Sequence, residues 1–211
     1  LHLCDRRQRQ MCIRDRNKII EIGAVKVRNG EIIDRMDEFV NPEVPIPFDI
    51  ERLTGINDAM VMGADTVDKV LPRFLEFVGD AALVAHNASF DVSFISHNAG
   101  LLGLPFDPTV LDTVTLARAL LPNLNRFKLD TVAKALGVSL ENHHRAVDDA
   151  EATAGIFLKF VEMLKKQHDM TTLDQLEEFS HVSDETIMKM PTYHVCLLYT
   201  SDAADDRISG D

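Results

Sequence analysis

The sequence predicts an α/β fold in which a mixed β-sheet is covered by helices. Two strand-rich runs around an Asn-Gly dipeptide come first, and short apolar strands then alternate with helical segments. A hairpin supplies antiparallel strands, whereas strands that alternate with helices pair in parallel. Hydrophobic residues make up 45% of the chain, which suffices for a packed core. No apolar run approaches the ~20 residues of a membrane span.

The first predicted elements are a hairpin and a short helix. Residues 19–27 alternate between apolar and small or polar side chains, and residues 31–40 form the return strand after the Asn29-Gly30 turn. Prolines keep residues 41–47 extended. A short helix over residues 49–53 ends at Gly55.

The later elements alternate between helices and strands. Apolar spacing predicts helices over residues 66–78, 90–102, 113–120, 129–136 and 145–166. Short apolar runs predict strands over residues 81–85 and 109–112, and residues 191–195 begin another strand-like run.

The two ends of the chain do not read as protein sequence. A DNA sequence that encodes residues 6–15 gives residues 196–205 when its reverse complement is read in a shifted frame. Such a DNA resembles a transposon adapter used for sequencing libraries. We therefore expect residues 1–16 and 196–211 to be non-native tails. The alternative interpretation is two ordinary disordered tails.

Removing these tails changes the composition. All three cysteines (Cys4, Cys12 and Cys196) lie in them, so the remainder has neither a disulfide framework nor a cysteine-based zinc site. A cysteine-free chain fits a reducing compartment. The charges of the tails cancel, so the net charge of −12 belongs to the remainder and argues against a broad DNA-binding face. A nuclease is not excluded, because bound metals reverse the local field.

Two motifs contain residues that can bind metal ions or transfer protons. Residues 86–91 read His-Asn-Ala-Ser-Phe-Asp, and residues 144–150 read His-Arg-Ala-Val-Asp-Asp-Ala. Each places an Asp shortly after a His, where a strand or loop leads into a helix. Asp binds hard divalent cations, and a His with a pKa near neutrality can accept the proton of water. The pair of motifs therefore predicts metal-assisted phosphodiester hydrolysis.

Each residue taken alone also has a simpler interpretation. Asp91 can belong to a capped helix start, and we favour a turn-shaping role for His86. Asp149 can belong to a charge pair at a helix N-terminus, and Asp112 is as readily an N-cap as a metal ligand. Taken together these alternatives weaken, since His144 and Asp149 flank the start of one helix and can share one cavity.

These motifs resemble those of the DnaQ-like, DEDDh-type 3′–5′ exonucleases. Residues 86–91 resemble the second motif of that family, and residues 144–150 resemble the third. Residues 19–27 are similar to the strand that follows the first motif, and residues 53–56 resemble the substrate-contacting loop. Within this family, the motif sequences are most similar to those of the proofreading domain of the PolC-type DNA polymerase III group, where the exonuclease is inserted within a PHP domain.

The resemblance implies a ribonuclease H-like sheet and a site for two divalent cations, Mg²⁺ or Mn²⁺. Asp91 and Asp149 would be metal ligands, and His144 would be the general base. The implied substrate-binding residues are Thr54, Gly55, Ile56, His86, Asn87 and Phe90.

The resemblance also implies an activity, partners and a domain organisation. We expect removal of mismatched nucleotides from a single-stranded DNA 3′ end, release of nucleoside 5′-monophosphates, a polymerase core as partner, no membrane, and a cytoplasmic location. Residues 17–168 would form the exonuclease domain, and residues 169–195 a linker and the start of a PHP-like segment. The alternatives are an RNA-directed 3′–5′ exonuclease and a non-catalytic module that keeps the fold.

One part of the family pattern is missing. The first motif, an Asp-x-Glu on the first strand, should precede Ile19, where the adapter-like tail stands instead. Neither Asp5 nor Asp15 is followed two residues later by Glu. We therefore expect the first central strand to be lost, or replaced by an ill-suited segment such as residues 11–14, and this fragment to be inactive. Glu21 lies outside the motif and is not expected to be a ligand.

Overall fold

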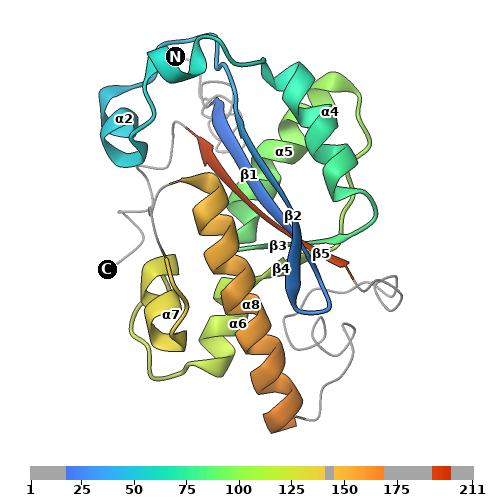
Figure 1. The fold of residues 1–211 in the computed structure, drawn as a ribbon, viewed down its shortest axis with the longest axis vertical. Coiled ribbons are helices and arrows are strands. Elements are labelled where there is room, and N and C mark those ends of the chain that lie inside the picture. The colour runs from blue at the N-terminus through green and yellow to red at the C-terminus, as the bar shows by residue number, and fades with distance from the viewer. Residues whose placement is uncertain (1–17, 141–144, 169–191, 201–211) are drawn as a thin grey trace, which may run out of the picture.

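The computed structural model describes residues 18–140, 145–168 and 192–200, and these form one mixed sheet flanked by helices (Figure 1). The sheet order is β2-β1-β5-β3-β4. The strands are β1 (Ile19–Arg28), β2 (Glu31–Phe39), β3 (Ala82–Ala85), β4 (Val110–Asp112) and β5 (Thr192–Thr200). The helices are α2 (Phe48–Thr54), α3 (Asp58–Val61), α4 (Val67–Val78), α5 (Ala88–Leu102), α6 (Thr113–Leu120), α7 (Leu129–Leu136) and α8 (Ala146–His168).

The predicted hairpin is confirmed. β1 and β2 pair antiparallel, and their turn residues Asn29 and Gly30 have φ values of 54° and 84°. Asn and Gly are the residues that tolerate this left-handed conformation, so the dipeptide determines where the chain reverses. Two helix ends follow the same rule, since α2 and α7 stop at Gly55 and Gly137, both left-handed.

The central position of the sheet is filled from the C-terminal side of the chain. β5 lies between β1 and β3, antiparallel to β1 and parallel to β3. Residues 11–14, the segment expected there, lie outside the described residues. Without β5, β1 and β3 would each present a row of unpaired backbone groups to the other. β5 satisfies both rows, and residues 192–200 are a run of mostly apolar, β-branched and aromatic residues suited to a strand.

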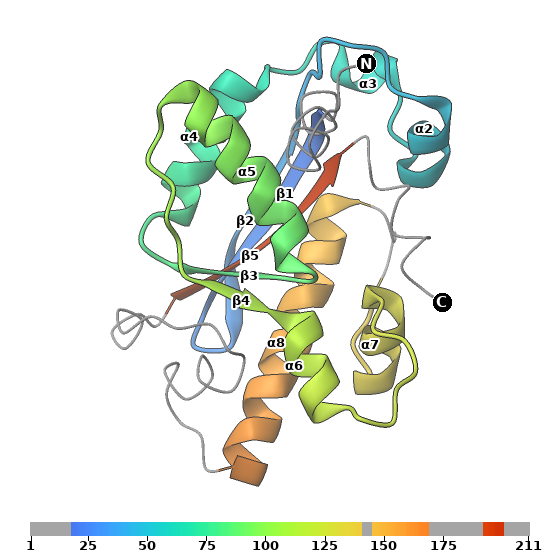
Figure 2. The ribbon, with the colours of Figure 1, turned by 180° about the vertical axis from the view of Figure 1, so that it is seen from behind.

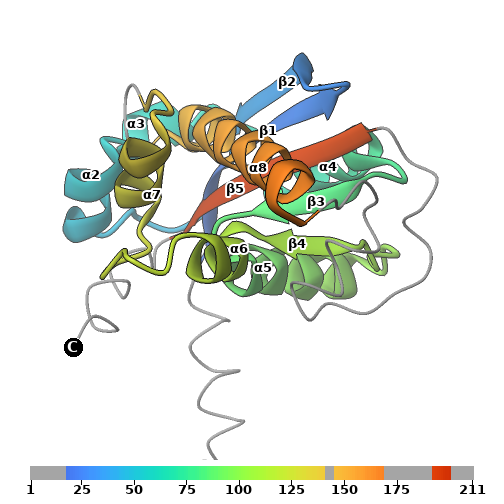
Figure 3. The ribbon, with the colours of Figure 1, turned by 90° about the horizontal axis from the view of Figure 1, so that it is seen from below.

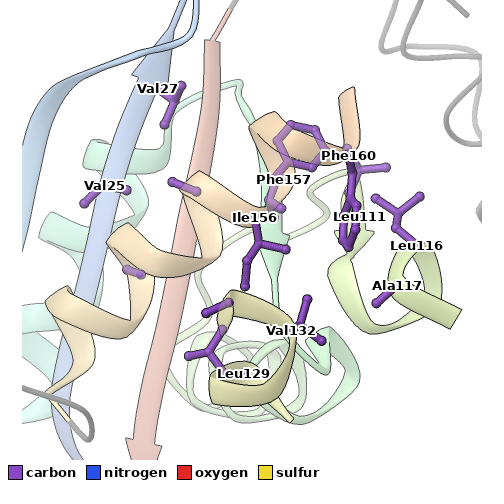
Figure 4. Close-up of a cluster of buried hydrophobic side chains, with 14 of the residues drawn as sticks. Val25, Val27, Leu111, Leu116, Ala117, Leu129, Val132, Ile156, Phe157 and Phe160 are labelled. Carbon is purple, nitrogen blue, oxygen red and sulfur yellow. The ribbon is translucent and has the colours of Figure 1, made fainter. Parts of the chain in front are cut away.

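Helices cover both faces of the sheet (Figures 2 and 3). Alternate residues of β1 divide between two clusters, because side chains of a strand point to opposite faces in turn. Ile22 and Ala24 pack with α4 and α5, whereas Val25 and Val27 pack with α6, α7 and α8. Figure 4 shows the second cluster, in which Phe157 and Phe160 of α8 are fully buried.

The remaining predictions from sequence are largely confirmed. α5 begins two residues earlier than expected, and α3 was not predicted. α3 is a single turn whose start depends on Asn57, since the Asn57 side chain accepts a hydrogen bond from Met60 N at 3.1 Å. Within the part of the chain that the structure describes, no helix is both long and apolar enough to cross a membrane.

Candidate active site

Two buried carboxylates stand in the first turns of two different helices. Asp91 lies in α5 and is 4% exposed, while Asp149 lies in α8 and is fully buried. The strand register places both helix starts at one level of the sheet. Val84, the residue before the end of β3, pairs with the β5 residue that also pairs with Val25, and the start of α8 packs on Gly23, two residues earlier on β1. The topology thus relates two carboxylates that lie far apart in sequence.

The start of α5 is held by a residue from another strand. Asn87 occupies the N-cap position in a left-handed conformation, with φ 68°, and its side chain makes no capping bond. The carboxylate of Asp112 accepts hydrogen bonds from Asn87 N at 3.1 Å and Ala88 N at 3.2 Å. It also accepts one from Val114 N at 2.8 Å and so caps α6. Asp112 is therefore the N-cap of α6 and also holds the backbone at the start of α5, and its three backbone contacts favour that role over metal binding.

His86 bridges three segments through both ring nitrogens. Nδ1 lies 2.8 Å from Thr113 Oγ1, and Nε2 lies 2.8 Å from the carbonyl oxygen of Phe127. A carbonyl only accepts hydrogen bonds, so Nε2 carries a proton. These contacts support the turn-shaping role favoured for His86. Both ring nitrogens are therefore engaged within the protein.

The predicted strand-end loop presents backbone rather than side chains. Thr54 is 5% exposed, and its hydroxyl donates to Ile50 O at 2.8 Å and accepts from Ile56 N at 3.1 Å. The Ile56 side chain is fully buried, so it supports the loop from beneath and does not line an open surface. Gly55 is exposed and left-handed. Without a side chain at Gly55, a ligand can approach the backbone of the loop there.

The Phe90 ring is half-buried in the first turn of α5, whereas His144, the predicted general base, lies outside the described residues. Phe90 packs on Phe94 with ring centroids 5.1 Å apart, which leaves part of its ring facing outward. His144 belongs to residues 141–144, which the structure does not describe. Its proposed role thus stays a prediction.

The donor set within the described residues is incomplete for a metal pair. Asp91 and Asp149 offer the carboxylate oxygens that hard divalent cations prefer. However, no three His, Cys, Asp or Glu side chains gather into a possible metal site among the residues that the structure describes. The central strand β5 carries neither Asp nor Glu in its sequence. Among the described residues, these two carboxylates alone do not complete a metal site.

Sequence reasoning set Glu21 aside as outside the motif, yet it is a buried charge. Its side chain is fully buried on β1, and burial raises the pKa of this carboxyl above its ordinary 4.5. The N–H of Ala146 and the guanidinium of Arg145 act in the opposite direction. An acidic residue inside the otherwise uninterrupted run of apolar and small residues 19–25 was the available signal, because a buried charge requires a partner.

Comparison with known proteins gives one family. The family model described as Exonuclease (RNase_T) matches residues 10–157. The chain is 50% identical over 182 residues to the PolC-type DNA polymerase III of Clostridium perfringens, covering 86% of this chain and 12% of that protein. It is 47% identical over 182 residues to the PolC-type enzyme of Caldanaerobacter subterraneus subsp. tengcongensis, covering 86% and 13%. The chain thus spans about an eighth of the length of these relatives.

Solved structures agree on the fold. Exonuclease X in complex with 5′ overhanging duplex DNA superposes with a TM-score of 0.60 at 27% identity, covering 77% of this chain and 91% of that chain. A 3′-exonuclease that recognises the 3′ end of a histone mRNA stem-loop gives a TM-score of 0.59 at 20% identity, over 72% and 58%. The second likeness shows the fold alone. Both confirm the predicted ribonuclease H-like class.

Proposed function

The chain belongs to the exonuclease family, and we propose that it is the 3′–5′ DNA exonuclease module with which a replicative polymerase proofreads. It would hydrolyse the terminal phosphodiester of a single-stranded 3′ end and release a nucleoside 5′-monophosphate. The observation that supports this most is that Asp91 and Asp149 are buried carboxylates in the first turns of two helices, α5 and α8. Burying a carboxylate is costly, so two buried acids in the first turns of helices mark a candidate functional site.

Each proposed role follows from the chemistry of the residue. Asp91 and Asp149 would hold divalent cations, Mg²⁺ or Mn²⁺, together with carboxylates of an intact first strand. When bound, such cations supply Lewis-acid polarisation of the phosphate. His144 would accept the proton of the attacking water, because an imidazole titrates near neutral pH. The backbone at Gly55 and the ring of Phe90 would contact the terminal nucleotide, with Asn87 shaping the wall beside them.

The present chain, without an Asp-x-Glu strand, would digest DNA poorly. Its central strand β5 provides no carboxylate at the place where the family carries Asp-x-Glu. The remaining two carboxylates would then have to hold the cations unaided. We also propose that residues 1–16 and 196–211 are non-native, that 17–168 are the domain, and that 169–195 lead into a PHP-like segment. β5 crosses the boundary after residue 195, so it joins both kinds of sequence.

The relatives are DNA polymerases III of the PolC type, which favours DNA over RNA as the substrate. The partner would be the polymerase core of the same parent chain, and the location the cytoplasm. An RNA-directed exonuclease of the same family is the second candidate, since one solved structure with this fold recognises an mRNA 3′ end. Equal digestion of single-stranded DNA and RNA of one sequence would favour that candidate.

The test requires an extended chain, in which the Asp-x-Glu strand of a relative replaces residues 1–16 so that it precedes Ile19, beside the chain as it stands. With Mg²⁺, the extended chain should degrade single-stranded DNA from the 3′ end, and the chain as it stands should not. Asp149→Ala should abolish the activity. His144→Ala should lower the single-turnover rate by about 10²–10⁴ and leave DNA affinity nearly unchanged. An inert extended chain, or robust digestion by the present chain that Asp149→Ala removes, would contradict the proposal.

A further inference from the structure

An ion pair between the fully buried Glu21 and the half-buried Arg145 joins strand β1 to the start of helix α8. Oε1 of the fully buried Glu21 lies 2.8 Å from Nε and 2.8 Å from Nη2 of Arg145. Oε2 accepts a hydrogen bond from the backbone N–H of Ala146 at 2.8 Å. Because the acceptor is ionised and the guanidinium binds through two nitrogens, these bonds are short and directional. The first residue of α8 is therefore anchored by a side chain from another element.

Steric contact holds the same helix start. Gly23 lies two residues after Glu21 and on the same face of β1, because strand side chains alternate. A Cβ atom at position 23 would lie 2.2 Å from the carbonyl carbon of Ala146 and 2.2 Å from Val147 N. The backbone of α8 thus rests directly on the strand. We call Glu21, Gly23 and Arg145 the helix seat.

The helix seat lies one turn from a proposed metal ligand. Asp149 N donates to Arg145 O at 3.0 Å, which is the first hydrogen bond of the helix. The position and orientation of the Asp149 carboxylate therefore depend on how the first turn of α8 packs against β1. His144 precedes Arg145 directly in the sequence.

Stability alone is a weak reason for this arrangement. Desolvating two charges offsets most of their attraction, and well-packed apolar residues of similar volume often stabilise as well or better. Apart from Glu21, β1 between Ile19 and Val25 is buried and uncharged. Arg145 is further surrounded by Asp37 at 3.5 Å and by the Phe39 ring at 5.2 Å. What the pair adds over apolar packing is a directional restraint on the helix start.

We propose that Glu21 is a positioning residue of the exonuclease reaction. Through Arg145 and the Ala146 amide it holds the first turn of α8, so that the Asp149 carboxylate is presented at one position. This inference rests on the proposed function. Loss of a group that orients a metal ligand typically lowers metal affinity or activity by about 10–100-fold.

Two variants of the extended chain separate positioning from stability. Glu21→Gln keeps the volume and one acceptor oxygen. Glu21→Leu combined with Arg145→Met replaces the pair with apolar side chains and should keep the thermal midpoint within a few degrees of the unchanged chain. Glu38→Gln is the matched control, because Glu38 pairs with Arg73 between β2 and α4, away from α8. Mn²⁺ binding is followed by electron paramagnetic resonance without DNA, and cleavage by single-turnover kinetics.

Both Glu21 variants should bind Mn²⁺ about 10–100-fold more weakly and cleave more slowly, while the Glu38 control matches the unchanged chain. A purely structural ion pair would instead let the apolar double variant recover Mn²⁺ affinity along with its thermal midpoint. The inference is overturned if either Glu21 variant, folded by circular dichroism, binds Mn²⁺ and cleaves like the control. If the unchanged extended chain neither binds Mn²⁺ nor digests DNA, the proposed function fails first and the inference falls with it.

Discussion

The contact between Gly23 and the start of α8 predicts the consequence of one methyl group. In Gly23→Ala, the new Cβ would meet two backbone atoms at 2.2 Å, whereas ordinary contacts begin at 3.4 Å. Backbone atoms cannot rotate away as a side chain does. The strand and the helix must therefore separate by more than about 1 Å.

The free energy of unfolding should fall by about 3–5 kcal/mol. Overpacking of a core contributes roughly 1–3 kcal/mol, and it reaches the upper end when backbone atoms must move. The separation also breaks the hydrogen bond from Ala146 N to the Glu21 carboxylate, and such bonds to charged groups contribute about 1.5–3 kcal/mol. The lower entropy of an unfolded chain with alanine offsets roughly 0.4–1 kcal/mol.

Gly100→Ala is the matched control. Gly100 lies inside α5, and a Cβ there would have no atom within 4 Å. Alanine is favoured over glycine in a helix by about 0.5–1 kcal/mol, so this variant should be slightly more stable than the unchanged chain. Both variants of the 211-residue chain are compared by urea unfolding followed by far-ultraviolet circular dichroism. If Gly23→Ala unfolds within about 0.5 kcal/mol of the unchanged chain while Gly100→Ala behaves as expected, the close approach is refuted.

Three further perturbations are measurable. Asp112→Ala removes the cap of α6 and two hydrogen bonds from the backbone at the start of α5. It should lower the free energy of unfolding by about 1–4 kcal/mol, while exposed Asp107→Ala changes it by under ~0.5. His86→Ala should lower the free energy of unfolding, measured in urea, by about 1–3 kcal/mol. The same variant of the extended chain should bind DNA with unchanged affinity; weaker DNA binding at unchanged stability would show that His86 contacts DNA directly. Hydrogen bonds, first from Arg73, lower the pKa of Asp65 below its ordinary 3.8. That contribution is present above pH 3.8 and is lost as the pH falls through the folded-state pKa, so Arg73→Gln should make the thermal midpoint less sensitive to acid; unchanged acid sensitivity would exclude this pair.

Local signals predicted most of the elements, because those signals act over a few residues. The Asn29-Gly30 turn needs only residues that accept positive φ, and Gly55 and Gly137 end helices for the same reason. α3 escaped prediction because it is only four residues long, too short for helical spacing to emerge.

The sequence by itself determined the strand and helix pattern, the two carboxylate motifs and the absence of cysteine from residues 17–195. Only the tertiary structure decided which residues that are distant in sequence contact one another. Asp112 holds the start of a helix from a neighbouring strand, Glu21 anchors a helix 125 positions away, and β5 takes the central place in the sheet. Contacts between distant residues depend on how the whole chain provides partners for its buried backbone and charged groups. The spacing of residues along a short segment does not predict those partners.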